Sequence, residues 1–269
     1  MTRVIAVANQ KGGVGKTTTT VNLGAGLAER GRSVLLLDLD PQASLTLALA
    51  ADTSRVPGEN GSAAQAEAVT VHDVLLRALR GEAPAFARAI RTTRSGLALL
   101  PASIELSAVE LDLSREPLGV FALRDGLEAL PTAYDYVLID CPPSLGILTA
   151  NALAAATGVV IPLQADYLAL RGVDLLLATI AKMQKRANPE LRVLAVILTQ
   201  ADLRTLHTRE VIAAARAAFG ERVPILDEVV PYSVRLKEAP LAQASVLEYA
   251  SKTAAAEAYR RLAASIDAV

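Results

Sequence analysis

The sequence predicts an α/β protein in which a mostly parallel, twisted sheet carries helices on both faces. Short runs of Val, Ile and Leu alternate along the 269-residue chain with longer, alanine-rich stretches. The short runs are apolar without regular polar alternation, which is typical of strands buried on both faces. Strand, helix and strand in succession favour right-handed crossovers and therefore parallel strands.

The composition indicates a large buried core. Hydrophobic residues make up 52% of the chain and charged residues 20%, which excludes an intrinsically disordered protein. The single cysteine excludes a disulfide framework and a cysteine zinc cluster. A net charge of −1 gives no overall basic field to attract nucleic acid. Because neither a signal peptide nor a membrane-spanning stretch is apparent, we expect a cytoplasmic protein without a membrane partner.

The expected strands are apolar runs dominated by leucine or β-branched residues. They lie at residues 4–8, 34–37, 97–100, 136–139, 159–163, 192–198 and 225–230. The expected helices are alanine-rich stretches between and after these strands. They lie at residues 16–30, 104–111, 120–130, 147–156, 173–186, 208–219 and 253–266. Gly31 is expected to end the first of these helices, and Asn188-Pro189 the fifth.

Residues 51–68 break this pattern. They contain Pro57, Gly58 and further small or polar residues, with almost no large apolar side chains. Such a composition indicates a surface loop or insertion. The segment is too short to form a second domain, so residues 1–269 are predicted to form a single domain.

The strongest functional signal is a glycine-rich turn between the first expected strand and the first expected helix. Its residues are Gln10, Lys11, Gly12, Gly13, Val14, Gly15, Lys16, Thr17 and Thr18. Glycines let consecutive backbone amides curl around phosphate oxygens, and the helix N-terminus adds positive potential. Lys16 is expected to reach the β- and γ-phosphates, and the Thr17 hydroxyl to bind Mg²⁺. The turn therefore predicts a phosphate loop; a glycine-rich turn without a ligand is the alternative.

Lys11 is a second lysine in this loop. Lys16 already serves the bound phosphates, so a single nucleotide does not need Lys11. Its long cationic side chain could reach a nucleotide in a facing subunit and neutralise developing charge, as an arginine finger does in trans. The alternative is a solvated lysine.

Aspartates follow two of the expected strands. Asp38 and Asp40 stand at the end of an apolar run, where open parallel sheets bind their ligands. We assign Asp38 to the Mg²⁺ shell and Asp40, beside Pro41, to positioning of the attacking water; an acidic turn is the alternative. Asp140 ends a second apolar strand, as expected for a Walker B acid that holds Mg²⁺ through water. Cys141, next to it, fits a small buried residue better than a nucleophile.

Three motifs in this order resemble the deviant Walker A ATPases of the ParA/MinD superfamily, and among them most of all the ParA/Soj chromosome and plasmid partition ATPases. The motifs are Lys-Gly-Gly-Val-Gly-Lys-Thr-Thr-Thr, Asp-Leu-Asp-Pro-Gln and Ile-Asp-Cys-Pro-Pro-Ser-Leu. The resemblance runs from about residue 2 to about residue 262. It implies a P-loop NTPase fold and an enzyme that hydrolyses ATP to ADP and phosphate with Mg²⁺ as cofactor.

The resemblance also implies a cycle and roles within it. ATP is sandwiched between two subunits, the homodimer binds double-stranded DNA without sequence preference, and a ParB-type partner stimulates slow hydrolysis and release. Such a protein would be nucleoid-associated. Lys11 would reach across the dimer, and Gly12 would face the partner, where a side chain obstructs the sandwich. The adenine side would be lined by Pro231, Val234 and Leu236. Pro231-Tyr232-Ser233 departs from the usual Pro-Arg-Asn.

DNA contacts are predicted in the C-terminal third by the same resemblance. Arg204 and Arg235 match the pattern of surface cations, and further cations lie near them in the sequence. These additional candidates are Arg209, Arg216, Lys237 and Lys252. Residues 200–269 carry equal numbers of acidic and basic side chains, so DNA binding would require their segregation onto one face. Ordinary solvated charge is the alternative for each residue.

Three other functions compete with partition. A MinD-like, membrane-recruited positioning ATPase needs an amphipathic anchor, but Tyr259, Leu262 and Ile266 form a stripe among alanines that suits a helix docked on the sheet. A metallocluster carrier needs a cysteine pair, and the single cysteine of this chain does not supply one. A repressor of the autoregulating type needs an N-terminal helix-turn-helix domain, for which the strand expected at residue 4 leaves no room.

Overall fold

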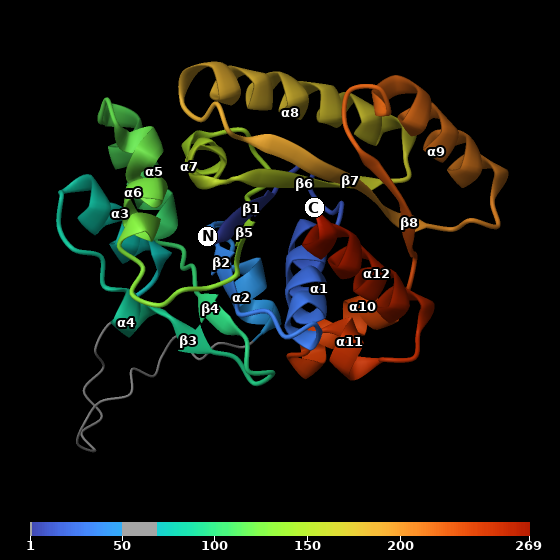
Figure 1. Ribbon diagram of the computed structural model, residues 1–269, viewed down its shortest axis with the longest axis horizontal. Coiled ribbons are helices and arrows are strands. Elements are labelled where there is room, and N and C mark those ends of the chain that lie inside the picture. Colours follow the sequence, from blue (N-terminus) through green and yellow to red (C-terminus); the bar gives the residue numbers. More distant parts are fainter. Residues whose placement is uncertain (1, 50–68) are drawn as a thin grey trace.

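A computed structural model of the chain describes residues 2–49 and 69–269. The insertion predicted at residues 51–68 lies outside the described residues. An eight-stranded sheet with the order β3-β4-β2-β5-β1-β6-β7-β8 runs through the centre (Figure 1). Among the strands that the structure describes, every pairing is parallel except that of β3 with β4. The predicted α/β class with a mostly parallel sheet is confirmed.

The strands follow the apolar runs closely. They are β1 (Arg3–Val7), β2 (Val34–Asp38), β3 (Arg91–Thr92), β4 (Ala98–Leu100), β5 (Tyr136–Asp140), β6 (Gly158–Gln164), β7 (Arg192–Ala201) and β8 (Ile225–Pro231). Seven of them overlap the predicted strands, whereas the two-residue β3 is too short to leave a pattern in the sequence.

Helices cover both faces of the sheet. Those that overlap the predicted helices are α1 (Lys16–Glu29), α5 (Leu106–Arg115), α6 (Ala122–Glu128), α7 (Ile147–Ala155), α8 (Tyr167–Arg186), α9 (Leu206–Phe219) and α12 (Ala254–Ala268). The additional ones are α2 (Ser44–Ala48), α3 (Val71–Leu79), α4 (Phe86–Ala89), α10 (Arg235–Glu238), η2 (Ala239–Ala242) and α11 (Val246–Tyr249), while η1 (Gly119–Phe121) overlaps the start of the helix predicted at residues 120–130.

Alternate side chains of each central strand enter two different cores. In β2, Leu35 and Leu37 join the larger core together with residues of α3, α5, α7, α8 and α9. Leu36 joins the other core, with residues of α1, α11 and α12. Figure 1 shows these two helical layers on opposite faces of the sheet. Because both faces are covered, the strands read as continuous apolar runs.

The helix that follows the phosphate loop is fixed by close packing on α12. A Cβ atom added at Gly26 of α1 would lie 2.8 Å from the Cβ of Ala263, so only glycine permits this approach. From α12, Tyr259 reaches back to the start of α1, where its hydroxyl lies 3.3 Å from that of Thr19. The base of the phosphate loop is therefore anchored in the core beneath it.

Candidate nucleotide site

The glycine-rich turn joins β1 to α1 at the carboxyl edge of the sheet. Gly13 and Gly15 adopt φ values of +74° and +89°, which glycine reaches without strain. Within the described residues, the backbone amides of residues 12–18 find no protein acceptor. Successive unsatisfied N–H groups at a helix N-terminus form an anion-binding hollow. The turn therefore has the geometry expected of a phosphate loop.

Lys16 lies within this hollow. Its ammonium donates to the carbonyl of Lys11 at 3.2 Å, across the loop, and the residue is only 8% exposed. Burial lowers the pKa of Lys16, which the nearby Asp140 carboxylate partly offsets. A phosphate anion would supply the charge that favours the protonated ammonium.

Three aspartates gather beneath the loop. Asp38 ends β2 and pairs in register with Asp140, the last residue of the neighbouring β5. Asp140 accepts a hydrogen bond from the Thr17 hydroxyl at 2.6 Å. Burial, with the charge of Asp38 second, raises the pKa of Asp140 well above its ordinary value. Burial also raises the pKa of Asp38. Crowded buried carboxyls of this kind favour a nearby cation.

Asp38 and Asp40 differ in their partners. Asp38 is fully buried and accepts from the Thr46 amide at 2.8 Å, from the Thr46 hydroxyl at 2.7 Å and from the Asp40 amide at 3.2 Å. Asp40 accepts from the Gln42 amide at 2.9 Å and is 9% exposed. Asp38 thus fixes the turn after β2, which places Asp40 at the site. The metal role of Asp38 and the water-positioning role of Asp40 stay predictions.

The donor atoms beneath the loop suit magnesium. Thr17 supplies a hydroxyl oxygen and Asp140 a carboxylate oxygen, and hard oxygen donors are the ligands Mg²⁺ prefers. Within residues 2–49 and 69–269, no group of three or more His, Cys, Asp or Glu side chains could hold a metal by itself. A nucleotide-bound Mg²⁺ with few protein ligands fits this arrangement better than a protein-only metal site.

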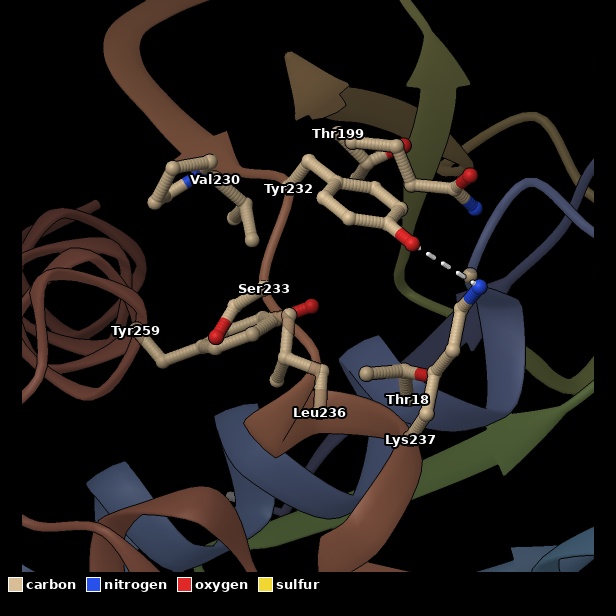
Figure 2. A pocket seen from close by; sticks show the side chains of 11 residues that line it. Thr18, Thr199, Val230, Tyr232, Ser233, Leu236, Lys237 and Tyr259 are labelled. Carbon is tan, nitrogen blue, oxygen red and sulfur yellow. Dashed lines mark hydrogen bonds between the residues drawn. The ribbon is translucent and has the colours of Figure 1, made fainter. Parts of the chain in front are cut away.

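A pocket for a planar base opens beside the loop. It is lined from the loop side by Gly15 and Thr18 and from β8 onward by Pro231, Tyr232 and Leu236. In Figure 2 the Tyr232 ring lies on one side of the hollow and Leu236 on the other. A mostly apolar pocket adjoining an anion hollow is suited to a nucleotide.

The predicted adenine residues are partly brought together. Pro231 and Leu236 line the pocket, whereas Val234 is 55% exposed and is not among the lining residues. Thr199, Gln200 and Tyr259 also line it, although none of them was predicted to belong to the nucleotide site. The first two come from β7, and no local motif marks a residue that approaches the loop only through the order of strands in the sheet.

Lys237 borders this pocket, although the resemblance pointed to DNA. Its ammonium lies 3.2 Å from the Tyr232 hydroxyl and 5.0 Å from the centre of the ring, as Figure 2 shows for the hydrogen bond. The pair closes the edge of the hollow. Lys237 therefore lines the pocket and also belongs to α10, together with Arg235.

The other predicted DNA cations are exposed, and most are paired. Arg204 lies 2.8 Å from Asp202, Arg216 lies 3.0 Å from Asp227, and Arg235 lies 2.7 Å from Glu238. Lys252 is exposed near the start of α12. Their DNA roles stay predictions.

Lys11 lies at the rim of the loop. Its backbone amide donates to the Asn9 side chain at 3.0 Å, and its ammonium lies 2.7 Å from the carboxylate of Asp166. Gly12 follows it, and a Cβ atom added there would meet nothing within 4 Å. The rim is therefore open at Gly12. In the described part of the chain, no helix is both long and apolar enough to cross a membrane.

Fold and site together define a P-loop ATPase whose loop carries two lysines. A family model described as an AAA domain matches residues 2–193. The chain is 44% identical to the chromosome-partitioning ATPase Soj of Thermus thermophilus, over 98% of this chain and 95% of that protein. It is 42% identical to the chromosome partitioning protein ParA of Caulobacter vibrioides, over 98% and 93%. The chain belongs to the ParA/Soj family of chromosome-partitioning ATPases.

Solved structures agree with this membership. A Mycobacterium smegmatis protein titled cobyrinic acid a,c-diamide synthase, with bound ATP analog and magnesium, is 40% identical, with a TM-score of 0.80 over 98% of this chain and 93% of that one. The septum site-determining protein MinD of Pyrococcus horikoshii, complexed with Mg-ADP, is 27% identical, with a TM-score of 0.73 over 99% and 96%. The predicted family, ATPase activity and use of ATP and Mg²⁺ are confirmed.

Proposed function

We propose that this chain is a DNA-partitioning switch in which bound ATP joins two copies into a dimer that holds DNA without sequence preference. The observation that carries the proposal is the run of unsatisfied amides at residues 12–18 around the buried ammonium of Lys16. Gly12, next to this hollow, leaves the rim of the subunit open. A second copy approaching that rim would complete the site.

Hydrolysis would use the residues around the hollow in separate roles. The amides of the loop and Lys16 bind and orient the phosphates. Thr17 and Asp140 would hold Mg²⁺, which when bound neutralises charge on the phosphate oxygens. Asp40, held by the Gln42 amide, would orient the attacking water. Since no group in this set is placed as a strong base in the described structure, we expect slow intrinsic hydrolysis that a ParB-type partner stimulates.

DNA binding would depend on the surface cations of the C-terminal third. Arg235 and Lys237 of α10 lie in or beside the segment that lines the base pocket. Nucleotide binding and DNA binding would therefore involve neighbouring parts of one element. Because the cations are paired with acids, DNA phosphates must compete with these carboxylates, and binding should fall steeply with salt.

The C-terminal helix argues against membrane recruitment through α12. Tyr259, Leu262 and Ile266 are each at most 1% exposed, because they pack against the core beneath α1. An interfacial helix needs such an apolar face to be available to lipid. The two cores share one sheet, which supports the proposal that the whole chain forms a single ATPase domain.

Binding to non-specific double-stranded DNA with ATP, with ADP and without nucleotide tests the proposal. We expect DNA binding with ATP only, and a lower affinity at higher salt. The same protein should not bind anionic liposomes in any of these states. ATP-dependent liposome binding without DNA binding would support a MinD-like positioning ATPase and contradict the partition role, including the nucleoid association that we propose.

A further inference from the structure

We propose that Gln200, which lies outside the phosphate loop in the sequence, is a positioning residue. It fixes the orientation of the loop backbone by a hydrogen bond to the carbonyl of Gly13. The Gln200 side-chain amide donates to the Gly13 carbonyl at 2.5 Å. Its neighbour Thr199 donates from its hydroxyl to the Val14 carbonyl at 2.8 Å. Two consecutive carbonyls of the loop are therefore tied to the end of one strand, β7.

These two bonds determine where the loop amides point. In a trans peptide the C=O and the following N–H point in opposite directions. When Gln200 holds the Gly13 carbonyl toward β7, the Val14 amide is turned to the other side of the loop. Thr199 turns the Gly15 amide in the same way. Both amides belong to the set without a protein acceptor, so the tie leaves them free for an anion.

An unusual backbone conformation at Gln200 accompanies this contact. Gln200 adopts a φ of +53°, a left-handed conformation that is unfavourable for a residue with a Cβ atom. The register of β7 against β8 also shifts between Leu198 and Ala201, around this residue. Bulges of this kind re-aim a side chain beside a functional site, and backbone strain persists where the surroundings enforce it. Here the re-aimed side chain is the one that reaches Gly13.

Gln200 also lines the base pocket, so a direct contact with the base is the competing explanation. The two explanations differ in what they predict for a ligand without a base. Loop positioning affects every ligand that carries the phosphates, whereas a base contact affects only nucleotides. The inference rests on the proposed nucleotide site, and the experiment distinguishes a failure of the inference from a failure of that site.

The test is the affinity of variants for Mg·ATP and for magnesium tripolyphosphate, measured by calorimetry and by competition. Gln200→Met keeps the length of the side chain and removes the donor. We expect it to weaken both ligands by a similar factor, about threefold to tenfold, the effect of one hydrogen bond. Gln200→Gly also relieves the left-handed backbone, so it should bind as weakly while its melting temperature does not fall.

Gln243 supplies the matched control. It is an exposed glutamine with a φ of +57°, at the end of η2. Gln243→Met and Gln243→Gly should leave both affinities at the wild-type value. Unchanged affinities of Gln200→Met for both ligands would overturn the inference. A weaker affinity for ATP with an unchanged affinity for tripolyphosphate would overturn it too, because the effect would then lie at the base. A wild-type protein that binds ATP but not tripolyphosphate would also contradict it. If Lys16→Ala binds ATP like the wild type, the nucleotide site itself is wrong, which is a different result.

Discussion

The ammonium of Lys11 lies 2.7 Å from the carboxylate of Asp166, so the rim lysine of the phosphate loop is held by its own subunit. Asp166 precedes α8, in the connection from β6. Both side chains are about one-third exposed, at 34% and 37%, so the ion pair contributes about 1 kcal/mol or less. A second copy could therefore draw Lys11 away at small cost.

Asp166→Asn tests whether this ion pair opposes dimerisation. If Lys11 must leave Asp166 to reach the facing subunit, weakening the pair should raise the ATP-dependent dimer association constant about threefold to tenfold, since two copies are released. Analytical ultracentrifugation with a slowly hydrolysed ATP analogue measures it. Asp174→Asn breaks a comparable surface pair with Arg222 and should have no effect. A dimer constant lowered by Asp166→Asn would show that the pair supports the dimer.

Gly12→Val tests whether the rim meets a partner. Within the subunit a Cβ atom at this position would touch nothing within 4 Å, so the variant should fold and keep the melting temperature of the wild type. The added side chain should obstruct a second copy, and light scattering with ATP should find a monomer. A normal ATP-dependent dimer would exclude Gly12 from the interface.

Local sequence patterns predicted the central residues of the nucleotide site, but they could not predict contacts between residues far apart in the sequence. The loop, Lys16 and the aspartates that end β2 and β5 follow from strand-to-helix spacing and from the rule that ligands bind at the carboxyl ends of parallel strands. Gln200 and Asp166 could not be predicted in this way. They meet loop residues that lie 187 and 155 positions away in the sequence, through the order of strands in the sheet.

The start of α3 is marked in the sequence by a capping box, although no helix was predicted there. Thr70 and Asp73 form a capping box, in which each side chain accepts from the backbone of the other. A threonine followed three residues later by an acid marks a helix start. The ion pairs of the predicted DNA cations were not predicted. Asp227 meets Arg216 only in the folded chain, and Glu238 meets Arg235 through the i,i+3 spacing of a helix.

Tyr232→Ala tests the wall of the base pocket. Tyr232 stands where the family pattern has arginine, and its ring is supported by Lys237 at 5.0 Å. Base stacking on an aromatic ring contributes about 1–3 kcal/mol, and for a residue that is 53% exposed we expect the lower end, about fivefold in ATP affinity. Tyr232→Phe keeps the ring and should bind ATP like the wild type. An equal loss in both variants would assign the effect to the hydroxyl.

Asp267 makes the docking of α12 sensitive to acid. Its carboxylate accepts from Arg32 at 2.8 Å, from Tyr136 at 2.9 Å and from Arg30 at 3.0 Å, and chiefly the Arg32 bond lowers its pKa to about 2. A depressed pKa in the folded state adds stability above the unfolded value of about 3.9, which is lost as the pH falls toward 2.

Asp267→Asn should therefore lower the free energy of unfolding at pH 7 by about 1 kcal/mol, since the arginines are half-exposed and solvent screens the interaction. The difference from the wild type should shrink between pH 4 and pH 2 in denaturant titrations. A difference that stays constant over this range would assign the effect to packing instead of charge.

The central claim is that the amides of the loop and the ammonium of Lys16 together bind a triphosphate. Calorimetric titration of Lys16→Ala with Mg·ATP tests it most directly, with Lys182→Ala, an exposed lysine of α8, as the control. Loss of a buried, charge-assisted contact should weaken ATP binding by about tenfold to a hundredfold or abolish it, while the control binds normally. An ATP affinity of Lys16→Ala equal to that of the wild type would contradict the account.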